Sequence, residues 1–371
     1  MYVKPGPLAP CPKQFAPGTW ASKSMGQWTL PLTLEAQQEI YANQNPEDCS
    51  KAKYLVYHVV PNGVGAVIHV AGVALQIALD LNRVYVEASG TFLTDSPQCG
   101  SSKTLDSCYF LPFSKCKPTQ AQLADAPQLV SPSGKGQEDK PVLTVMHEAI
   151  VEVRAQAPKR FWGRLNQTDM DPKKWYYWWR AQAAAYMLRP NEATLKEIER
   201  RKKTMIAGPA PALGCISVHV RHGDKGVEAQ TFDDRVYDNT AAKLHGLDPD
   251  RFSDRLWVST EDPNTITYFA ANGTATAAGN KWQTGYIAGT PRKPDRNKAN
   301  LAYMAEIGYY EEVLNAMTNL DLALECDGFV GSIYSNWVRL IDEMRSTIRC
   351  KANAVFVDVV YENPHSMDVN W

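Results

Sequence analysis

The most regular pattern along the chain is an alternation of apolar and polar positions over residues 216–220, which ends in a cluster of ionisable side chains. Three apolar residues alternate with Ser217 and His219, and Arg221 and His222 follow directly. A period of two predicts a β-strand. Because ligands of open α/β sheets bind at the carboxyl ends of the strands, we expect an anion to bind here. The alternative interpretation is a strand followed by a charged surface turn.

Other segments predict two α/β units. The first has a strand at 54–60, a turn at 61–65, a helix to about residue 81 and a strand at 83–87, which is the order of a βαβ crossover. The second starts with the 216–220 strand and continues with a strand at 255–259, a helix over 302–324, a strand at 328–333 and a helix over 335–345. A helical region from about 173 to 203, interrupted at Pro190, lies between them.

Composition narrows the class of protein. The chain has 371 residues, 44% of them hydrophobic, and a net charge of −1. This length predicts about two domains, and the balanced charge argues against a nucleic-acid partner. The uncharged stretch at residues 63–79 contains His69 and Gln76 and favours a buried helix over a membrane span. No leader is evident, so we expect either a cytoplasmic protein or one whose membrane anchor is absent from this chain.

The cysteines favour an oxidising compartment. The chain has eight, three of them clustered at Cys99, Cys108 and Cys116, and no CxxC pair. An even number clustered in this way is typical of disulfides, whose connectivity the sequence leaves open. The alternative is a set of buried free thiols. Two N-glycosylation sequons, at Asn166 and Asn272, point to the secretory pathway as well.

Several motifs, in the same order, resemble the α1,6-fucosyltransferase superfamily, which includes the N-glycan core fucosyltransferase, the rhizobial nodulation fucosyltransferase and, more distantly, protein O-fucosyltransferases. The similar segments are a lead-in at 45–53, a glycine turn with Gly63, Gly65 and His69, a tryptophan motif at 178–190, the 219–225 strand end, an acidic turn with Glu261 and Asp262, and a strand–helix junction with Ser335 and Asn336.

The resemblance implies a GT-B-like α/β fold with two Rossmann-type domains facing across a cleft. We expect a Pro-rich segment at 1–50, an acceptor-side domain at 51–205 and a nucleotide-sugar-binding domain at 206–371. It also implies an inverting, metal-independent reaction that moves L-fucose from GDP-fucose to a glycan hydroxyl in α linkage. The expected compartment is the Golgi or another part of the secretory lumen, with a glycan or glycoprotein as acceptor.

Site roles follow from the same resemblance. Arg221 would stabilise the diphosphate, since a guanidinium can grip two phosphate oxygens. Glu228, helped by Lys225, would act as the general base. The other expected nucleotide-sugar-binding residues are His219, Arg221, His222, Asp224, Glu261, Asp262, Asn319, Asp321, Ser335, Asn336, Gly63, Gly65 and His69. No metal site is expected, because the Asp-x-Asp strings at 169–171 and 248–250 favour solvated turns.

Two positions depart from the family pattern and keep other interpretations open. His222 and Gly223 replace an Arg-Thr pair, and Asn319 stands where relatives carry a guanine-reading aspartate, with Asp321 two residues later. The donor could therefore be another GDP- or UDP-sugar, and a glycan-binding protein without catalysis is a further alternative. The last alternative is a histidine phosphatase with His222 as nucleophile, because Arg221-His222-Gly223 is also the short signature of those enzymes.

Overall fold

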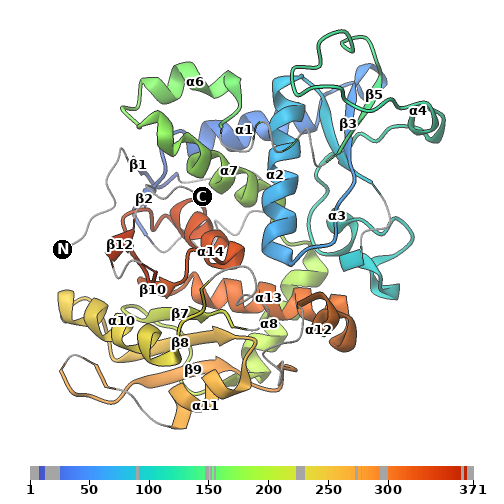
Figure 1. The fold of residues 1–371 in the computed structure, drawn as a ribbon. Helices are drawn as coiled ribbons and strands as arrows, with labels where there is room; N and C mark the ends of the chain where they lie inside the picture. The colour runs from blue at the N-terminus through green and yellow to red at the C-terminus, as the bar shows by residue number, and fades with distance from the viewer. Residues whose placement is uncertain are drawn as a thin grey trace.

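A computed structural model of the chain describes residues 8–12, 26–88, 92–146, 150, 153, 156–222, 230–271, 275–276, 278–292, 300–360 and 363–365. Two parallel sheets dominate these residues (Figure 1). The smaller sheet has the order β4-β3-β5 and the larger has the order β12-β11-β10-β7-β8-β9-β6. Only β12 and β6, at the edges of the larger sheet, run antiparallel to their neighbours. The expected α/β class, with one parallel sheet in each half of the chain, is confirmed.

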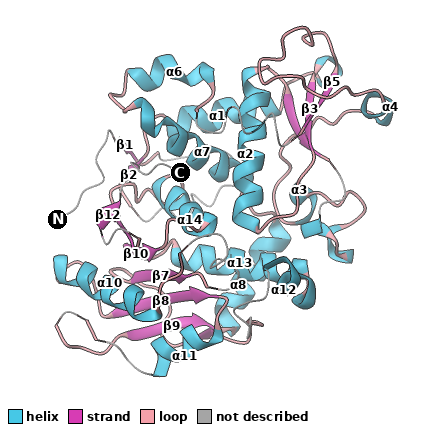
Figure 2. Ribbon diagram, in the orientation of Figure 1, coloured by secondary structure: helices cyan, strands magenta, loops and turns pink. Residues whose placement is uncertain are grey.

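The strands are short, and the helices contain more residues than the strands do (Figure 2). The strands are β1 (Ala9–Pro10), β2 (Trp28–Thr29), β3 (Tyr54–Tyr57), β4 (Val84–Glu87), β5 (Val142–Val145), β6 (Ile206–Ala207), β7 (Ile216–Val220), β8 (Arg255–Thr260), β9 (Gln283–Ile287), β10 (Gly328–Gly331), β11 (Val355–Asp358) and β12 (Asn363–His365). The helices of eight or more residues are α1 (Thr33–Gln44), α2 (Val64–Asp80), α6 (Lys159–Asn166), α7 (Trp175–Met187), α8 (Glu192–Thr204), α10 (Asp234–Leu247), α11 (Pro263–Ala271), α12 (Asn300–Ile307), α13 (Tyr309–Ala323) and α14 (Asn336–Ser346).

The helix expected over 302–324 is in fact two helices. The chain breaks at Gly308, whose φ of 87° lies in the left-handed region that favours glycine. A new helix, α13, therefore starts at Tyr309, and its first turn lies near the carboxyl ends of β7 and β8. This break decides which side chains of α13 reach the site described below.

Strand alternation sorts the side chains of the large sheet between two cores. On β7 the apolar residues of the alternation, such as Val218, pack with α10 and α11 on one face. Trp257 of β8 and Phe329 of β10 point to the other face, where α13 and α14 lie. That second core continues without a break into α2, α7 and the smaller sheet. The fully buried Trp178 and Trp179 of α7 belong to it, so the tryptophan motif is part of the core.

Contacts between helices tie the two halves of the molecule together. Helix α7 packs against α1, α2 and α14, and α14 also contacts α2 (Figure 1). At this junction the buried carboxylate of Glu343 accepts a hydrogen bond from His69 Nε2 (2.9 Å) and pairs with Arg180 (3.1 Å). Although burial opposes ionisation, Arg180 and His69 together lower the pKa of Glu343, so a charged carboxylate links α2, α7 and α14.

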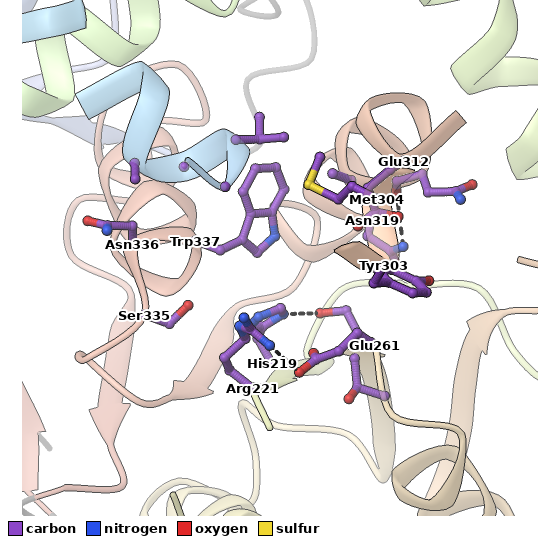
Figure 3. A pocket seen from close by; sticks show the side chains of 18 of the residues that line it. His219, Arg221, Glu261, Tyr303, Met304, Glu312, Asn319, Ser335, Asn336 and Trp337 are labelled. Carbon is purple, nitrogen blue, oxygen red and sulfur yellow. Dashed lines mark hydrogen bonds and ion pairs between the residues drawn. The ribbon is translucent and has the colours of Figure 1, made fainter. Parts of the chain in front are cut away.

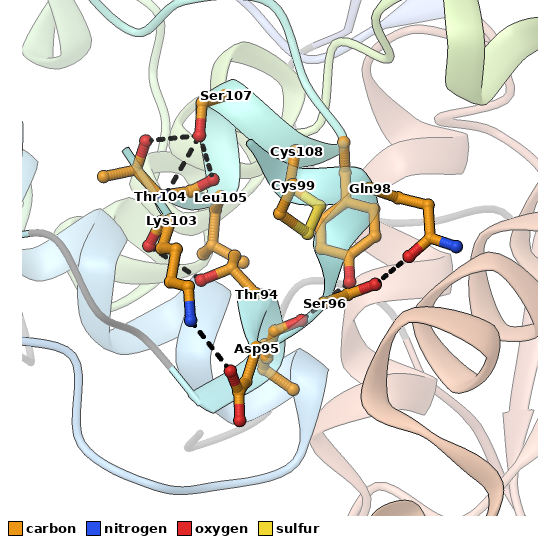
Figure 4. Close-up of a disulfide and its surroundings, with 12 residues drawn as sticks. Thr94, Asp95, Ser96, Gln98, Cys99, Lys103, Thr104, Leu105, Ser107 and Cys108 are labelled. Atoms are coloured by element: carbon orange, nitrogen blue, oxygen red, sulfur yellow. Dashed lines mark hydrogen bonds and ion pairs between the residues drawn. A yellow bond between two sulfur atoms is a disulfide. The ribbon is translucent and has the colours of Figure 1, made fainter. Parts of the chain in front are cut away.

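All eight cysteines form disulfides, which confirms the expectation of paired cysteines and fits an oxidising compartment. The pairs are Cys11–Cys350, Cys49–Cys116, Cys99–Cys108 and Cys215–Cys326. Figure 4 shows the shortest loop, where Cys108 lies at the end of a helical turn whose N-cap, Thr104, exchanges hydrogen bonds with Ser107. Of the two sequons, Asn166 is exposed and Asn272 lies outside the described residues. None of the described helices combines the length and the apolar character needed to span a membrane.

Candidate active site

A cavity of ≈ 330 Å³ lies where the carboxyl ends of β7 and β8 meet the first turns of α2 and α14 and one face of α13 (Figure 3). Eight of the residues expected to bind the nucleotide sugar line it. They are Gly63, Gly65, His219, Arg221, Glu261, Asn319, Ser335 and Asn336. The positions come from both halves of the chain, so the fold brings together residues that are more than 270 positions apart.

Two cross-strand pairs form the floor of the cavity. Strands β7 and β8 are parallel, and their register places His219 opposite Ser259. His219 Nδ1 lies 2.9 Å from Ser259 Oγ. Two residues further along, where side chains return to the same face, Arg221 Nη1 lies 2.5 Å from Glu261 Oε1. The alternation seen in the sequence therefore accounts for the side on which His219 and Arg221 lie.

Arg221 is the cation of this floor. Its side chain is 17% exposed, and besides Glu261 it donates to the main-chain oxygen of His222 (2.8 Å). The Glu261 carboxylate also accepts from the main-chain N–H of His222 (2.8 Å). Arg221 is thus held at the edge of the cavity by the Glu261 carboxylate and a main-chain oxygen, and its permanently charged guanidinium suits an incoming anion.

His219 is a neutral ring in this setting. Burial lowers its pKa to about 4, since charge on a ring without solvent is unfavourable. Its Nε2 atom is buried and has no hydrogen-bond partner among the described residues. The ring therefore offers one unused polar atom beside Arg221.

The first turn of α14 and the glycine turn form the opposite wall. Ser335 occupies the N-cap position of α14 but its hydroxyl makes no capping hydrogen bond, which argues against an ordinary cap. The first N–H groups of any helix lack partners inside it, so this wall can donate hydrogen bonds to phosphate oxygens. Gly65 permits a close approach of the two helices, because an added Cβ would lie only 3.0 Å from the main chain of Asn336 and Trp337.

One face of α13 completes the cavity. Glu312, Asn315 and Asn319 line it at spacings of three and four residues, which place them on the same side of a helix. Burial, strengthened by Glu261, raises the pKa of Glu312 to about 8, although Arg221 opposes the shift. Glu312 and Asn315 were not expected from the sequence. Their helical spacing from Asn319 was the available signal, but only the packing of α13 on the sheet shows which face is inward.

The sequence profile of one protein family matches this chain. The family is described as the alpha-(1,6)-fucosyltransferase N- and catalytic domains, and the match covers residues 22–272. This is more than half of the 371 residues. The chain belongs to this family. Membership supports glycosyltransferase activity, and the matched region contains the glycine turn, β7 and β8 but ends before α12, α13 and α14.

Solved structures of fucosyltransferases are similar to this family member at low identity. FUT1 from Arabidopsis thaliana in complex with GDP has 12% identity and a TM-score of 0.46, covering 84% of this chain and 73% of that one. NodZ from Bradyrhizobium has 13% identity and a TM-score of 0.45, covering 85% and 97%. POFUT1 in complex with GDP-fucose has 11% identity and a TM-score of 0.44, covering 80% and 94%.

Four of the expected site residues of this fucosyltransferase-family protein lie outside the cavity. His222 and Asp262 point to the other face of the sheet, because each is one residue from a cavity-facing neighbour. There His222 Nδ1 lies 3.0 Å from Asp262 and Nε2 donates to the main-chain oxygen of Phe232 (2.9 Å). With both ring nitrogens engaged, His222 is poorly placed to act as a phosphatase nucleophile.

The other two, His69 and Asp321, are buried in ion-pair clusters behind the cavity walls. His69 Nδ1 lies 3.0 Å from Asn336 Oδ1, so it supports a cavity-lining residue instead of lining the cavity itself. Asp321 pairs with Lys202 (2.9 Å) and Arg349 (2.6 Å) on another side of α13. Both residues therefore position elements of the site.

Three expected residues, Asp224, Lys225 and Glu228, lie outside the described part of the chain, and their roles stay predictions. The described residues contain no group of three or more His, Cys, Asp or Glu side chains arranged to hold a metal ion. In the first Asp-x-Asp string, Asp171 caps a short helical turn by accepting from Lys173 N (2.9 Å). The second string, at 248–250, follows α10, and neither string lines the cavity.

Proposed function

We propose that this protein transfers L-fucose from GDP-β-L-fucose to a hydroxyl group of a glycan, with inversion to an α linkage. The observation that carries the proposal is the convergence of Arg221 and the first turn of α14 on one cavity, in a chain that belongs to a fucosyltransferase family. A fixed guanidinium and helix-terminal N–H groups are the donors that a diphosphate leaving group requires.

The transfer itself needs a base and a leaving group. The acceptor hydroxyl gives its proton to Glu228, assisted by Lys225, while its oxygen attacks the anomeric carbon of fucose from the face opposite GDP. The bond between that carbon and the diphosphate oxygen breaks, and GDP leaves with the electron pair. Arg221 and the N–H groups of the first turn of α14, which follows Ser335, stabilise the negative charge that develops on the diphosphate.

A second donor is favoured by one specific observation. Asn319 lies in the cavity, and an amide oxygen accepts the two N–H groups of a guanine edge less well than a carboxylate does. The same fold with another GDP-sugar or a UDP-sugar is therefore the second candidate. The expected site of action is the Golgi or another secretory compartment, in keeping with the four disulfides.

The test is turnover of a panel of sugar nucleotides by the whole protein, read as released GDP or UDP with and without a glycan acceptor mixture. We expect GDP-fucose to be turned over, and to be turned over at an unchanged rate in EDTA. Release of UDP from a UDP-sugar alone would select the second donor. Binding of glycans without any nucleotide release would replace the transferase proposal by a glycan-binding one, and activity restored only by manganese would contradict the metal-independent mechanism.

A further inference from the structure

Asn315 of α13 carries a buried hydrogen-bond donor that nothing in the described part of the chain accepts. The residue is 4% exposed and lines the cavity, and its Nδ2 atom has no hydrogen-bond partner among the described residues. Leaving a buried N–H group without an acceptor costs free energy. A ligand atom that accepts from Asn315 Nδ2 would remove that cost.

A hydrogen bond from Arg201 fixes the orientation of the Asn315 amide. Arg201 Nη1 donates to Asn315 Oδ1. An arginine side chain has donors and no acceptor, so the atom facing it must be the amide oxygen and the NH2 group must lie on the other side. Arg201 is itself buried and held by Glu197 (2.7 Å) and Glu311 (2.8 Å). The fold therefore fixes the Asn315 NH2 group on the side of the amide away from Arg201, where it is available as a donor.

Asn319, one turn further along the same helix face, has the opposite polarity. Its Nδ2 donates to the main-chain oxygen of Asn315 (3.1 Å), which leaves Oδ1 as the atom that can accept from a ligand. Side chains four residues apart on a helix are neighbours, about 5–6 Å between Cβ atoms. The wall of the cavity thus presents a donor, Asn315 Nδ2, next to an acceptor, Asn319 Oδ1.

We propose that Asn315 and Asn319 read the lactam edge of the donor nucleobase, that is, a ring carbonyl next to a ring N–H. In guanine, O6 accepts from Asn315 Nδ2 and N1–H donates to Asn319 Oδ1, while the 2-amino group has no acceptor of its own in the pair. The inference rests on the proposed function, in which a nucleotide sugar occupies this cavity. It makes Asn315 a specificity-determining residue.

The lactam edge is shared by guanine, hypoxanthine and uracil, whereas adenine carries an amino group next to an unprotonated ring nitrogen. Binding of GDP, IDP, UDP and ADP to the whole protein, measured by titration calorimetry, separates these. We expect GDP and IDP to bind within about twofold of one another, because they differ only in the unread 2-amino group. ADP should bind at least about tenfold more weakly, the ratio that one lost hydrogen bond of about 1.4 kcal/mol produces.

Two isosteric variants test the residues. Asn315→Asp keeps an oxygen towards Arg201 but turns the donor into an acceptor, and we expect GDP and IDP both to bind at least about tenfold more weakly. Asn319→Asp adds an acceptor for the 2-amino group, so the preference for GDP over IDP should rise from about one to about tenfold. Both changes add a negative charge near the diphosphate, and binding of inorganic pyrophosphate to each variant measures that effect by itself.

The outcomes are distinct. A wild-type preference for GDP over IDP of tenfold or more, or unchanged GDP binding by a folded Asn315→Asp variant, would overturn the lactam pair while leaving the transferase proposal intact. If that variant fails to fold, the GDP-to-IDP ratios of the wild type and of Asn319→Asp still decide. Preferential binding of UDP would support the lactam pair and reject GDP-fucose as donor. No nucleotide binding by the wild type would remove both proposals.

Discussion

Replacing Arg221 by alanine removes the cation at the floor of the cavity and is the most direct perturbation of the proposed chemistry. The side chain is only 17% exposed, so solvent screens its charge weakly, and its Nη1 atom lies 2.5 Å from Glu261 Oε1. Loss of one preorganised charge-stabilising group typically costs about 2.7–4 kcal/mol in the transition state, which is about 10²–10³ in rate. We expect a loss of turnover of this size.

The effect on folding should be much smaller. Glu261 keeps the main-chain N–H of His222 as a donor at 2.8 Å when the guanidinium is gone. The variant should therefore remain folded by circular dichroism. Arg221→Lys retains the charge but lacks the planar guanidinium that can bind two phosphate oxygens side by side, so its turnover should lie between those of the alanine variant and the wild type.

The assay is release of GDP from saturating GDP-fucose, with Arg255→Ala as a matched control. Arg255 is the first residue of β8 and lies at the amino end of the strand, whereas the cavity lies at the carboxyl end. Its replacement by alanine should leave the rate of GDP release unchanged. Turnover within about threefold of wild type by folded Arg221→Ala protein would mean that the diphosphate is bound elsewhere and that the cavity is not the donor site.

Three other predictions concern charge, roles and cross-links. The pKa of Glu312 rises from its ordinary value of 4.5 to about 8 in the folded protein, so between these pH values the folded state holds one proton more than the unfolded state. The free energy of unfolding should therefore decrease as pH rises from about 4.5 to 8. In thermal melts over this range Glu312→Gln should show a smaller decrease than the wild type, and an equal decrease in both proteins would contradict the prediction. His222→Ala should lower the free energy of unfolding by about 1–3 kcal/mol, because the buried Asp262 carboxylate loses the imidazole that lies 3.0 Å from it. Glu228→Gln should abolish transfer with unchanged melting. Loss of activity in His222→Ala together with retained activity in Glu228→Gln would favour the phosphatase. Serine at both Cys215 and Cys326, which close a loop with a separation of 111 residues, should cost about 2–4 kcal/mol in denaturant titrations, and no loss would show that the pair does not form.

The sequence predicted the floor of the cavity well because the rule that places it is simple. Alternation along β7 puts His219 and Arg221 on one face, and a strand followed by an acidic turn puts Glu261 next to them. The same parity rule, applied to His222 and Asp262, would have directed them to the opposite face. Both residues were assigned to the nucleotide site by family resemblance, although this chain differs from its relatives at His222.

Features that depend on tertiary packing could not be predicted from the sequence. Strands such as β9 and β11 are short and lack a clear alternation, and the division of the 302–324 helix depends on Gly308 adopting a positive φ. Disulfide connectivity follows from which loops the fold brings together. The inward face of α13, and with it Asn315, follows from contacts between that helix and the sheet, for which a single sequence gives no register.

Helices α2 and α14 meet at Gly65, and this contact has an electrostatic consequence. The resembled family has a second arginine where this chain has His222, and the helix ends can replace part of its positive charge. Both helices begin at the cavity, and the aligned peptide units of each produce a macrodipole equivalent to about half a positive charge at that end. Two such ends together act as about one positive elementary charge, without any side-chain cation. Because these partial charges belong to the main chain, they cannot titrate and no substitution of a surface residue removes them. A diphosphate would then sit between one guanidinium and two helix termini, in a cradle whose charge the backbone itself provides.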